Sequence, residues 1–292
     1  MVFDAAKRGL VLWFEQLIPS LLPFLIFSNL LLSLTETRRS FLPKTSPGSV
    51  ITQRLFGLSP LGLYVLFMGH FCGYPAGAKI TSDLYSKNRL SRKEADFLLA
   101  IANQSSPAFI GTYLTSYILG QKSRIIPVFF IFYGSTIITA VVLRFLPFQS
   151  REETCRLVCA EAKPSLMQIL DYSITDAFSA MVRVGGYVIL FSIFSTFSMQ
   201  LFSGTGNIRF LLSASLEITN GLSLIKSAPF SAHSKWILAM ACTAFGGFSA
   251  MAQIKGMLIG TPLSIKPYII GKCIYTIVVV LMSELFFLSF PF

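Results

Sequence analysis

Apolar stretches of about 20 residues recur along the chain, and they limit the folds open to it more than any other feature. A helix rises 1.5 Å per residue, so a stretch of this length crosses the ~30 Å hydrocarbon core of a bilayer. The composition agrees, since 53% of the 292 residues are hydrophobic and 13% are charged, against roughly a quarter charged in ordinary soluble domains. The sequence therefore predicts an all-α, polytopic membrane protein. The stretches lie near residues 10–34, 60–82, 97–119, 125–147, 184–203, 236–258 and 267–290.

A shorter and more polar stretch at 207–225 has the length of half a span, which brings the expected total to about seven to eight hydrophobic segments. The basic pair at residues 7–8 precedes a long apolar run that lacks a signal-peptidase site, so we interpret this run as a retained first span. We expect a first membrane half at 1–147, a polar loop with an interfacial helix at 148–181, and a second membrane half at 182–292.

The formal net charge of +11 is distributed over short loops between the apolar stretches. This distribution is typical of contact with anionic lipid headgroups, and it argues against binding of nucleic acid. The sequence has no catalytic motif, no cluster with metal-ligand spacing and no cofactor fingerprint. We therefore expect no enzyme activity, no metal and no cofactor. An oligomer stays open.

The two halves contain similar strings. Residues 70–84, HFCGYPAGAKITSDL, match residues 244–258, AFGGFSAMAQIKGML, at six positions when the second string is shifted by 174 residues (247 minus 73). Both strings interrupt an apolar stretch with glycine. Internal repeats that each contain a broken or re-entrant helix are typical of secondary transporters, whose substrate site lies where the breaks face each other. The sequence therefore predicts two related halves and one shared site.

The first predicted break combines Gly73, Tyr74, Pro75 and Gly77, with Lys79 one turn later. An interrupted helix exposes backbone groups that lipid cannot satisfy, so a break survives only where it is packed in protein or lines a wet cavity. A helix that restarts here directs N–H groups and its positive end at the gap, and an ammonium group beside it favours an anion. The alternative is that the glycines form a packing face and that Lys79 extends to the membrane surface.

A polar box, ANQSSP, follows at residues 102–107 within another apolar stretch. Asn103, Ser105 and Ser106 carry amide and hydroxyl groups, and Pro107 frees backbone carbonyls nearby. We expect these side chains to face a ligand. The alternative is that they join helices by hydrogen bonds.

In the second half, SLEITNGL at 215–222 places Glu217, Thr219 and Asn220 in a short apolar stretch. An ionisable residue there is costly unless it is paired. Three roles stay open for Glu217: it binds a coupling cation or proton, it pairs with Lys255, or it is a solvated loop carboxylate.

The string FGGFSAMAQIK at 245–255 supplies Gly247, Ser249 and Gln253 as the second-half counterparts of the first break. We expect Gly73 and Gly247 to lie near each other, because the two breaks need a shared polar cavity. Arg183 and Lys272 border apolar spans, and we interpret both as interfacial anchors.

These strings resemble the sporulation integral membrane proteins of the YlbJ type, which are part of the wider group with the nucleoside-recognition, or Gate, domain. The resemblance covers nearly the whole chain, and a GYPAGAK string followed by an Asn-x-Ser-x-Pro box is its most specific part. The matching pieces are PSLLPFLIFSNLL (19–31), CGYPAGAKITSDL (72–84), LSRKEADFLLAIANQSSPAFIG (90–111), LEITNGL (216–222), FGGFSAMAQIKGML (245–258) and IKPYIIGK (265–272).

The resemblance implies a core similar to that of concentrative nucleoside transporters. It also implies transport of dipicolinic acid from mother cell to forespore, in a bacterial cell membrane such as the outer forespore membrane. Cys72 and Ser106 depart from the residues that we expect at these positions of the family. The expectation is therefore a permease for a small organic anion, first of all dipicolinate. The alternatives are a nucleoside or nucleobase permease and a sporulation membrane assembly factor that transports nothing.

Overall fold

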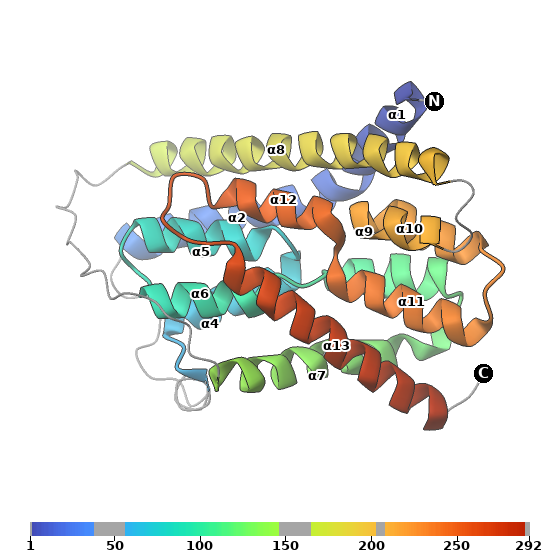
Figure 1. Ribbon diagram of the computed structural model, residues 1–292. Coiled ribbons are helices and arrows are strands. Elements are labelled where there is room, and N and C mark those ends of the chain that lie inside the picture. The colour runs from blue at the N-terminus through green and yellow to red at the C-terminus, as the bar shows by residue number, and fades with distance from the viewer. Residues whose placement is uncertain (1, 38–55, 146–164, 203–207, 290–292) are drawn as a thin grey trace.

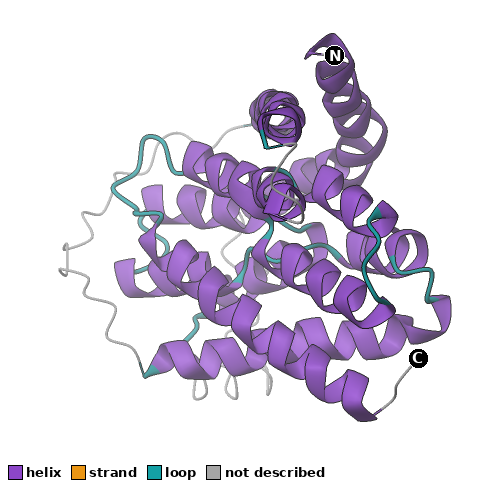
Figure 2. Cartoon of the chain, turned by 45° about the vertical axis from the view of Figure 1, so that its right-hand side comes forward, coloured by secondary structure: helices purple, strands orange, loops and turns teal. Residues whose placement is uncertain are grey.

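The computed structural model describes residues 2–37, 56–145, 165–202 and 208–289, and every regular element in these ranges is a helix (Figures 1 and 2). This agrees with the predicted all-α class. The elements are α1 (Val2–Leu12), the π-helix η1 (Trp13–Leu17), α2 (Ile18–Thr37), α4 (Pro60–Cys72), α5 (Ala76–Ser86), α6 (Arg92–Ile101), the π-helix η2 (Phe109–Ile118), the 3₁₀ turn η3 (Lys122–Arg124), α7 (Ile125–Arg144), α8 (Leu166–Leu201), α9 (Ile208–Leu216), α10 (Ile218–Ser227), α11 (Ala232–Phe245), α12 (Gly247–Met257) and α13 (Lys266–Ser289).

Four helical stretches in the described ranges are long and apolar enough to cross a membrane: Lys122–Arg144, Leu166–Leu201, Ala232–Met257 and Lys266–Ser289. Two further apolar helices are shorter, at Leu21–Leu31 and Pro60–Cys72. The chain is thus an all-α membrane protein, but the expected seven to eight hydrophobic segments are not supported as full spans. Several predicted segments are divided into short helices, because glycine, proline or polar residues interrupt them.

Serine caps mark where several of these helices begin. The side chains of Ser59, Ser91, Ser165 and Ser231 each accept a hydrogen bond from a backbone N–H in the first turn that follows. Such a cap satisfies one of the donors that a helix start leaves without an intrahelical partner. These serines therefore define the residue at which each of the four helices begins.

The first short pair, α4 and α5, is a helical hairpin. The chain leaves α4 at Gly73, whose φ of +84° favours glycine. It then passes Pro75 and returns, so that α5 packs against α4. In Figure 1 both ends of this hairpin lie on the left and its tip lies near the middle of the molecule.

The second short pair, α9 and α10, is a hairpin that opens toward the opposite end of the molecule (Figure 1). Its tip is Glu217, which separates the two helices. The helices are in close contact, because a Cβ placed on Gly221 would lie 2.2 Å from Cα of Ala214. Glycine at 221 is therefore required by the close approach of α9.

Each hairpin is followed by an interrupted helix that continues across the molecule (Figure 1). After the first hairpin, α6 ends at Ile101 and the chain continues through residues 102–107 into η2. After the second hairpin, α11 ends at Phe245, Gly246 caps it with a φ of +80°, and α12 follows from Gly247. α13 then packs against α6, α7 and α11.

This arrangement corrects the predicted internal alignment. Residues 70–84 belong to a hairpin, whereas residues 244–258 belong to a helix that continues through its break as one apolar stretch. The structural counterparts are instead the α4–α5 and α9–α10 hairpins, and the breaks at 102–107 and at Gly246. Small residues recur wherever helices approach closely, and both strings contain them.

The predicted interfacial helix and fifth span form one uninterrupted helix, the 36-residue α8. Gly185 lies within this helix and serves packing. A Cβ at Gly185 would lie 2.6 Å from the ring of Trp13, whose indole N–H donates to the carbonyl of Met181 (2.8 Å). Most of the predicted polar loop lies outside the described residues.

Candidate functional site

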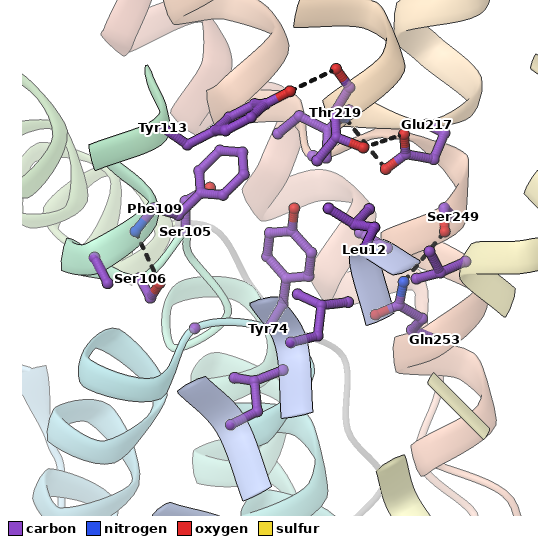
Figure 3. A pocket seen from close by; sticks show the side chains of 18 of the residues that line it. Leu12, Tyr74, Ser105, Ser106, Phe109, Tyr113, Glu217, Thr219, Ser249 and Gln253 are labelled. Atoms are coloured by element: carbon purple, nitrogen blue, oxygen red, sulfur yellow. Dashed lines mark hydrogen bonds between the residues drawn. The ribbon is translucent and has the colours of Figure 1, made fainter. Parts of the chain in front are cut away.

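The breaks and both hairpin tips surround one pocket of about 460 Å³ (Figure 3). Tyr74 rises through the centre of this view, with Phe109 and Tyr113 on one side and Thr219 and Glu217 on the other. The two hairpin tips and the two interrupted helices reach the pocket at or close to their interruptions. The lining includes Leu12, Cys72, Gly73, Tyr74, Ser105, Ser106, Phe109, Thr112, Tyr113, Tyr117, Glu217, Thr219, Gly246, Ser249, Ala250 and Gln253.

Tyr74 brings the first hairpin tip to the second interrupted helix. Its backbone N–H donates to the carbonyl of Gln104 (3.0 Å), and a Cβ on Gly246 would lie 3.6 Å from Cε1 of Tyr74. The break at Gly73 and the one at Gly247 are therefore neighbours, as the sequence predicted.

The polar box has two separate tasks. Asn103 Oδ1 accepts from the N–H of Ala78 (2.7 Å), so Asn103 caps the start of α5. Ser105 donates to the carbonyl of Thr243 on α11 (3.2 Å), and Ser106 accepts from the N–H of Phe109 (3.3 Å). Asn103 therefore connects the 102–107 segment to α5 by a hydrogen bond, while both serines also line the pocket.

Glu217 is buried, with 3% of its surface exposed, so it is not a solvated loop carboxylate. Its carboxylate accepts from the backbone N–H groups of Thr219 (3.2 Å) and Asn220 (2.8 Å) and from the Thr219 hydroxyl. The predicted alternative of an ion pair is also wrong, because Lys255 is exposed on α12. Glu217 caps α10, and the positive end of that helix compensates its charge.

The start of α12 forms another part of the wall. Ser249 and Gln253 are buried one turn apart, and Gln253 donates to the Ser249 hydroxyl (3.1 Å). Gly247 lies behind them rather than in the lining. A Cβ at Gly247 would lie 3.1 Å from the carbonyl oxygen of Ser215, so this glycine permits the close approach of α9 to α12.

The structure places Lys79 outside the pocket. Its ammonium group lies 2.6 Å from Asp83 Oδ2 and 2.8 Å from Asp176 Oδ2, and Asn29 also donates to Asp176 (2.8 Å). Two carboxylates thus hold Lys79 between α5 and α8. The expectation that Lys79 stands beside the bound anion does not fit this location.

Lys272 is a second lysine whose predicted position is wrong. Its side chain is fully buried rather than at an interface, and its ammonium group donates to Gln104 Oε1 (2.8 Å) and to the Ala244 carbonyl (3.0 Å). An ionisable residue inside the apolar run YIIGKCIY was the available signal. The predicted span begins at residue 267, so Lys272 lies close to its start, where a lysine is usually an interfacial anchor.

The aromatic wall was also missed. Tyr113 donates its hydroxyl to the carbonyl of Thr219 (3.0 Å), which joins η2 to α10. Phe109 and Tyr117 flank Tyr113 in a series of ring contacts, with centroids 5.1 and 5.5 Å apart. Their recurrence every four residues was the available signal, since residues four apart share one face of a helix.

A comparison with curated proteins found a relative of the chain. The sporulation integral membrane protein YlbJ of Bacillus subtilis (strain 168) is 31% identical over an alignment that covers 92% of this chain and 74% of the relative. The chain belongs to the YlbJ family of sporulation integral membrane proteins. No protein-family model matches it and no solved structure is significantly similar, so membership of the wider nucleoside-recognition group stays a prediction.

In this YlbJ-family member, the predicted site residues fall into two sets. The residues that line the pocket are Gly73, Tyr74, Ser105, Ser106, Glu217, Thr219, Ser249 and Gln253. Those outside its lining are Pro75, Gly77, Lys79, Asn103, Asn220 and Gly247. Asn220 lies instead in an adjoining cavity of about 500 Å³, which shares Leu12, Tyr113, Tyr117 and Thr219 with the pocket. That the lining residues bind a substrate stays a prediction.

Proposed function

We propose that the chain is a membrane permease for a small organic anion, with dipicolinate as the first candidate. One observation carries the proposal: both hairpin tips and both interrupted helices converge on a single pocket. Breaks in membrane helices require a polar cavity or packed protein around them. Four interruptions around one cavity are the arrangement expected of a transport site.

The orientation of the hairpins supports the same proposal. α4–α5 and α9–α10 open toward opposite ends of the molecule, and each precedes an interrupted helix and then a long apolar one. We interpret the hairpins as re-entrant segments of two halves with inverted orientation. Two such halves around a fixed site allow the site to open alternately toward either side of a membrane.

The pocket suits a small, flat solute with polar edges. Its volume of about 460 Å³ falls within the ~300–1,000 Å³ range of small-molecule sites. The aromatic rings of Tyr74, Phe109 and Tyr113 offer stacking surfaces, while Ser105 and Ser249 offer hydroxyl groups. A pyridine ring with two carboxylates has this shape and chemistry.

A nucleoside or nucleobase permease is the second candidate, and one observation favours it. Glu217 is the single charged side chain among the lining residues, and it is acidic. A neutral aromatic solute enters such a pocket without a compensating charge. An anion requires a positive charge close by or a cation that enters with it, and a cation-coupling role for Glu217 stays a prediction.

Uptake into proteoliposomes tests the proposal. The purified full chain is reconstituted, and the uptake of labelled dipicolinate and of labelled uridine is measured separately. We expect saturable dipicolinate uptake that protein-free vesicles lack. Uptake of uridine alone would favour the second candidate, and uptake of neither would favour the assembly factor.

A blocking substitution ties any flux to the pocket. Ser106→Phe fills the cavity at its wall, so uptake should fall at least tenfold while a tag still reports insertion. Ser116→Phe makes the same change on η2 outside the pocket lining and should keep most of the uptake. Equal losses in the two variants would argue that the pocket is not the path.

A further inference from the structure

Lys272 is a lysine without exposed surface inside an apolar helix. It belongs to α13, which is one of the four stretches able to cross a membrane, and its exposed fraction is 0%. A charged side chain at such a position is costly, so a residue of this kind is functional by default.

The contacts of Lys272 leave its charge without an opposite charge. Both hydrogen-bond acceptors, Gln104 Oε1 and the Ala244 carbonyl, are neutral. Three tyrosine rings surround the ammonium group, those of Tyr74, Tyr268 and Tyr275, at 5.8, 5.9 and 5.3 Å. The ion pairs among the described residues do not include Lys272. Buried charges are otherwise paired as a rule.

The ammonium group lies directly behind the pocket. Gln104 precedes the lining residue Ser105, Ala244 lies two residues before the lining residue Gly246, and the ring of Tyr74 itself belongs to the lining. The positive charge therefore acts on the cavity through one layer of protein. A charge in such surroundings is screened much less than an exposed one.

The two charged residues that the sequence pointed to, Lys79 and Glu217, do not meet this need. Lys79 is held between two carboxylates away from the pocket, and Glu217 has the wrong sign for an anion. The N–H of Tyr74 donates to Gln104 and that of Ala78 to Asn103, so the tip of the first hairpin already uses these donors within the protein.

We propose that Lys272 is the residue that makes the pocket select an anion, by supplying the positive charge behind Tyr74 and Ser105. The inference rests on the proposed permease function and deepens it, because it assigns the sign of the substrate's charge to one side chain. Lys272 acts on the substrate electrostatically, through the layer formed by Gln104 and Tyr74. It also links the two interrupted helices, so a purely structural role is the alternative that the test must separate.

The test compares an anionic with a neutral solute in the same proteoliposomes. Lys272→Gln removes the charge, and we expect the KM for dipicolinate to rise by about tenfold or more while the KM for uridine changes less than about threefold. Lys272→Arg keeps the charge and should retain a lower KM for dipicolinate than Lys272→Gln. Lys266→Gln, the same change at an exposed position of α13, is the matched control and should leave both values near those of the unmodified protein.

A second variant keeps the lysine and neutralises its field. Gln104→Glu has nearly the same shape and places a carboxylate 2.8 Å from the ammonium group, so it should reproduce the rise in KM for dipicolinate even if Lys272→Gln fails to fold. An unchanged KM in Gln104→Glu would overturn the inference. Equal losses for dipicolinate and uridine would also overturn it and assign Lys272 a structural role.

The unmodified protein separates this inference from the proposed function. If it transports dipicolinate but neither variant alters the KM, the inference about Lys272 fails and the permease stands. If it transports uridine and not dipicolinate, the anion selectivity fails and a permease remains. If it transports neither solute, the proposed function itself fails and the inference fails with it.

Discussion

The two hairpins have the same shape but are held in different ways. The α4–α5 tip depends on its neighbour, since Asn103 and Gln104 of the first interrupted helix satisfy the N–H groups of Ala78 and Tyr74. The α9–α10 tip satisfies its own donors through Glu217, which caps α10 from within the hairpin. The N–H groups of the first tip therefore depend on another segment, whereas those of the second tip are satisfied within the hairpin.

This difference indicates which hairpin is able to shift without leaving the N–H groups at its tip unsatisfied. Moving α4–α5 away from the 102–107 segment would leave buried N–H groups without acceptors, and each such group costs about 1–3 kcal/mol. Moving α9–α10 would keep the cap at Glu217 intact. The three predictions that follow test the contrast, from the largest expected effect to the smallest.

One close anchor of the first hairpin is a glycine contact. A Cβ on Gly77 would lie 2.1 Å from the carbonyl oxygen of Ala102, so Gly77→Ala should force α5 away from the first interrupted helix. We expect a loss of about 3 kcal/mol in stability, measured as a lower midpoint of thermal unfolding in detergent. Gly221→Ala makes the matching change inside the second hairpin, where Ala214 is the obstacle.

Gly186→Ala is the control for both glycine variants. No atom lies within 4 Å of a Cβ at Gly186, and alanine favours a helix over glycine by about 1 kcal/mol. This variant should be neutral or slightly more stable. The contrast between the hairpins weakens if Gly77→Ala is as stable as Gly186→Ala, because α5 would then not be held by its contact with Ala102.

A second anchor of the first hairpin is electrostatic. Lys79→Gln removes the ammonium group that Asp83 and Asp176 share, and the two carboxylates then repel each other in a mostly buried site. We expect a loss of about 2 kcal/mol, less than for a fully buried pair because these side chains remain 13–29% exposed. Adding Asp83→Asn should recover most of the loss in a double-mutant cycle. Additive losses would mean that the pair contributes little to holding α5.

Lys79 and Lys272 show that the sequence predicted the class of the fold better than the positions of individual side chains. Apolar stretches and interrupting glycines predicted the membrane class, the presence of breaks and their convergence, because these follow from hydropathy and from local backbone needs. They did not predict which strings correspond, since a hairpin and a continuing helix use the same small residues. The expected seven to eight segments were not supported for the same reason.

The roles of individual polar residues depended on long-range contacts that spacing does not encode. Lys79 lies four residues before Asp83 on its own helix, yet its second partner is Asp176 on α8. Lys272 meets Gln104, which is 168 residues away in sequence. Ser105, Ser249 and Gln253 lie in the wall, because Ser105 and Ser249 are close to a break and Gln253 is one helical turn after Ser249. Phe109 and Tyr113 lie beyond the first break, where aromatic residues are equally typical of lipid contact.

The last and smallest effect compares the two tips directly. Asn103→Ala removes the acceptor for the N–H of Ala78, and Glu217→Ala removes the cap of α10. Each should cost about 1–2 kcal/mol. Glu217→Gln keeps a side-chain oxygen and should cost only about 0.5–1 kcal/mol, the value of a charge at a helix N-terminus.

Amide hydrogen exchange then locates each loss of stability. Asn103→Ala should speed exchange in α5, where the acceptor comes from a different segment. Glu217→Ala should speed exchange at Thr219 and Asn220 while α5 keeps its protection. Faster exchange in both hairpins after either change would contradict the contrast, because it would mean that the tips open together and that the second hairpin is not independent of the first.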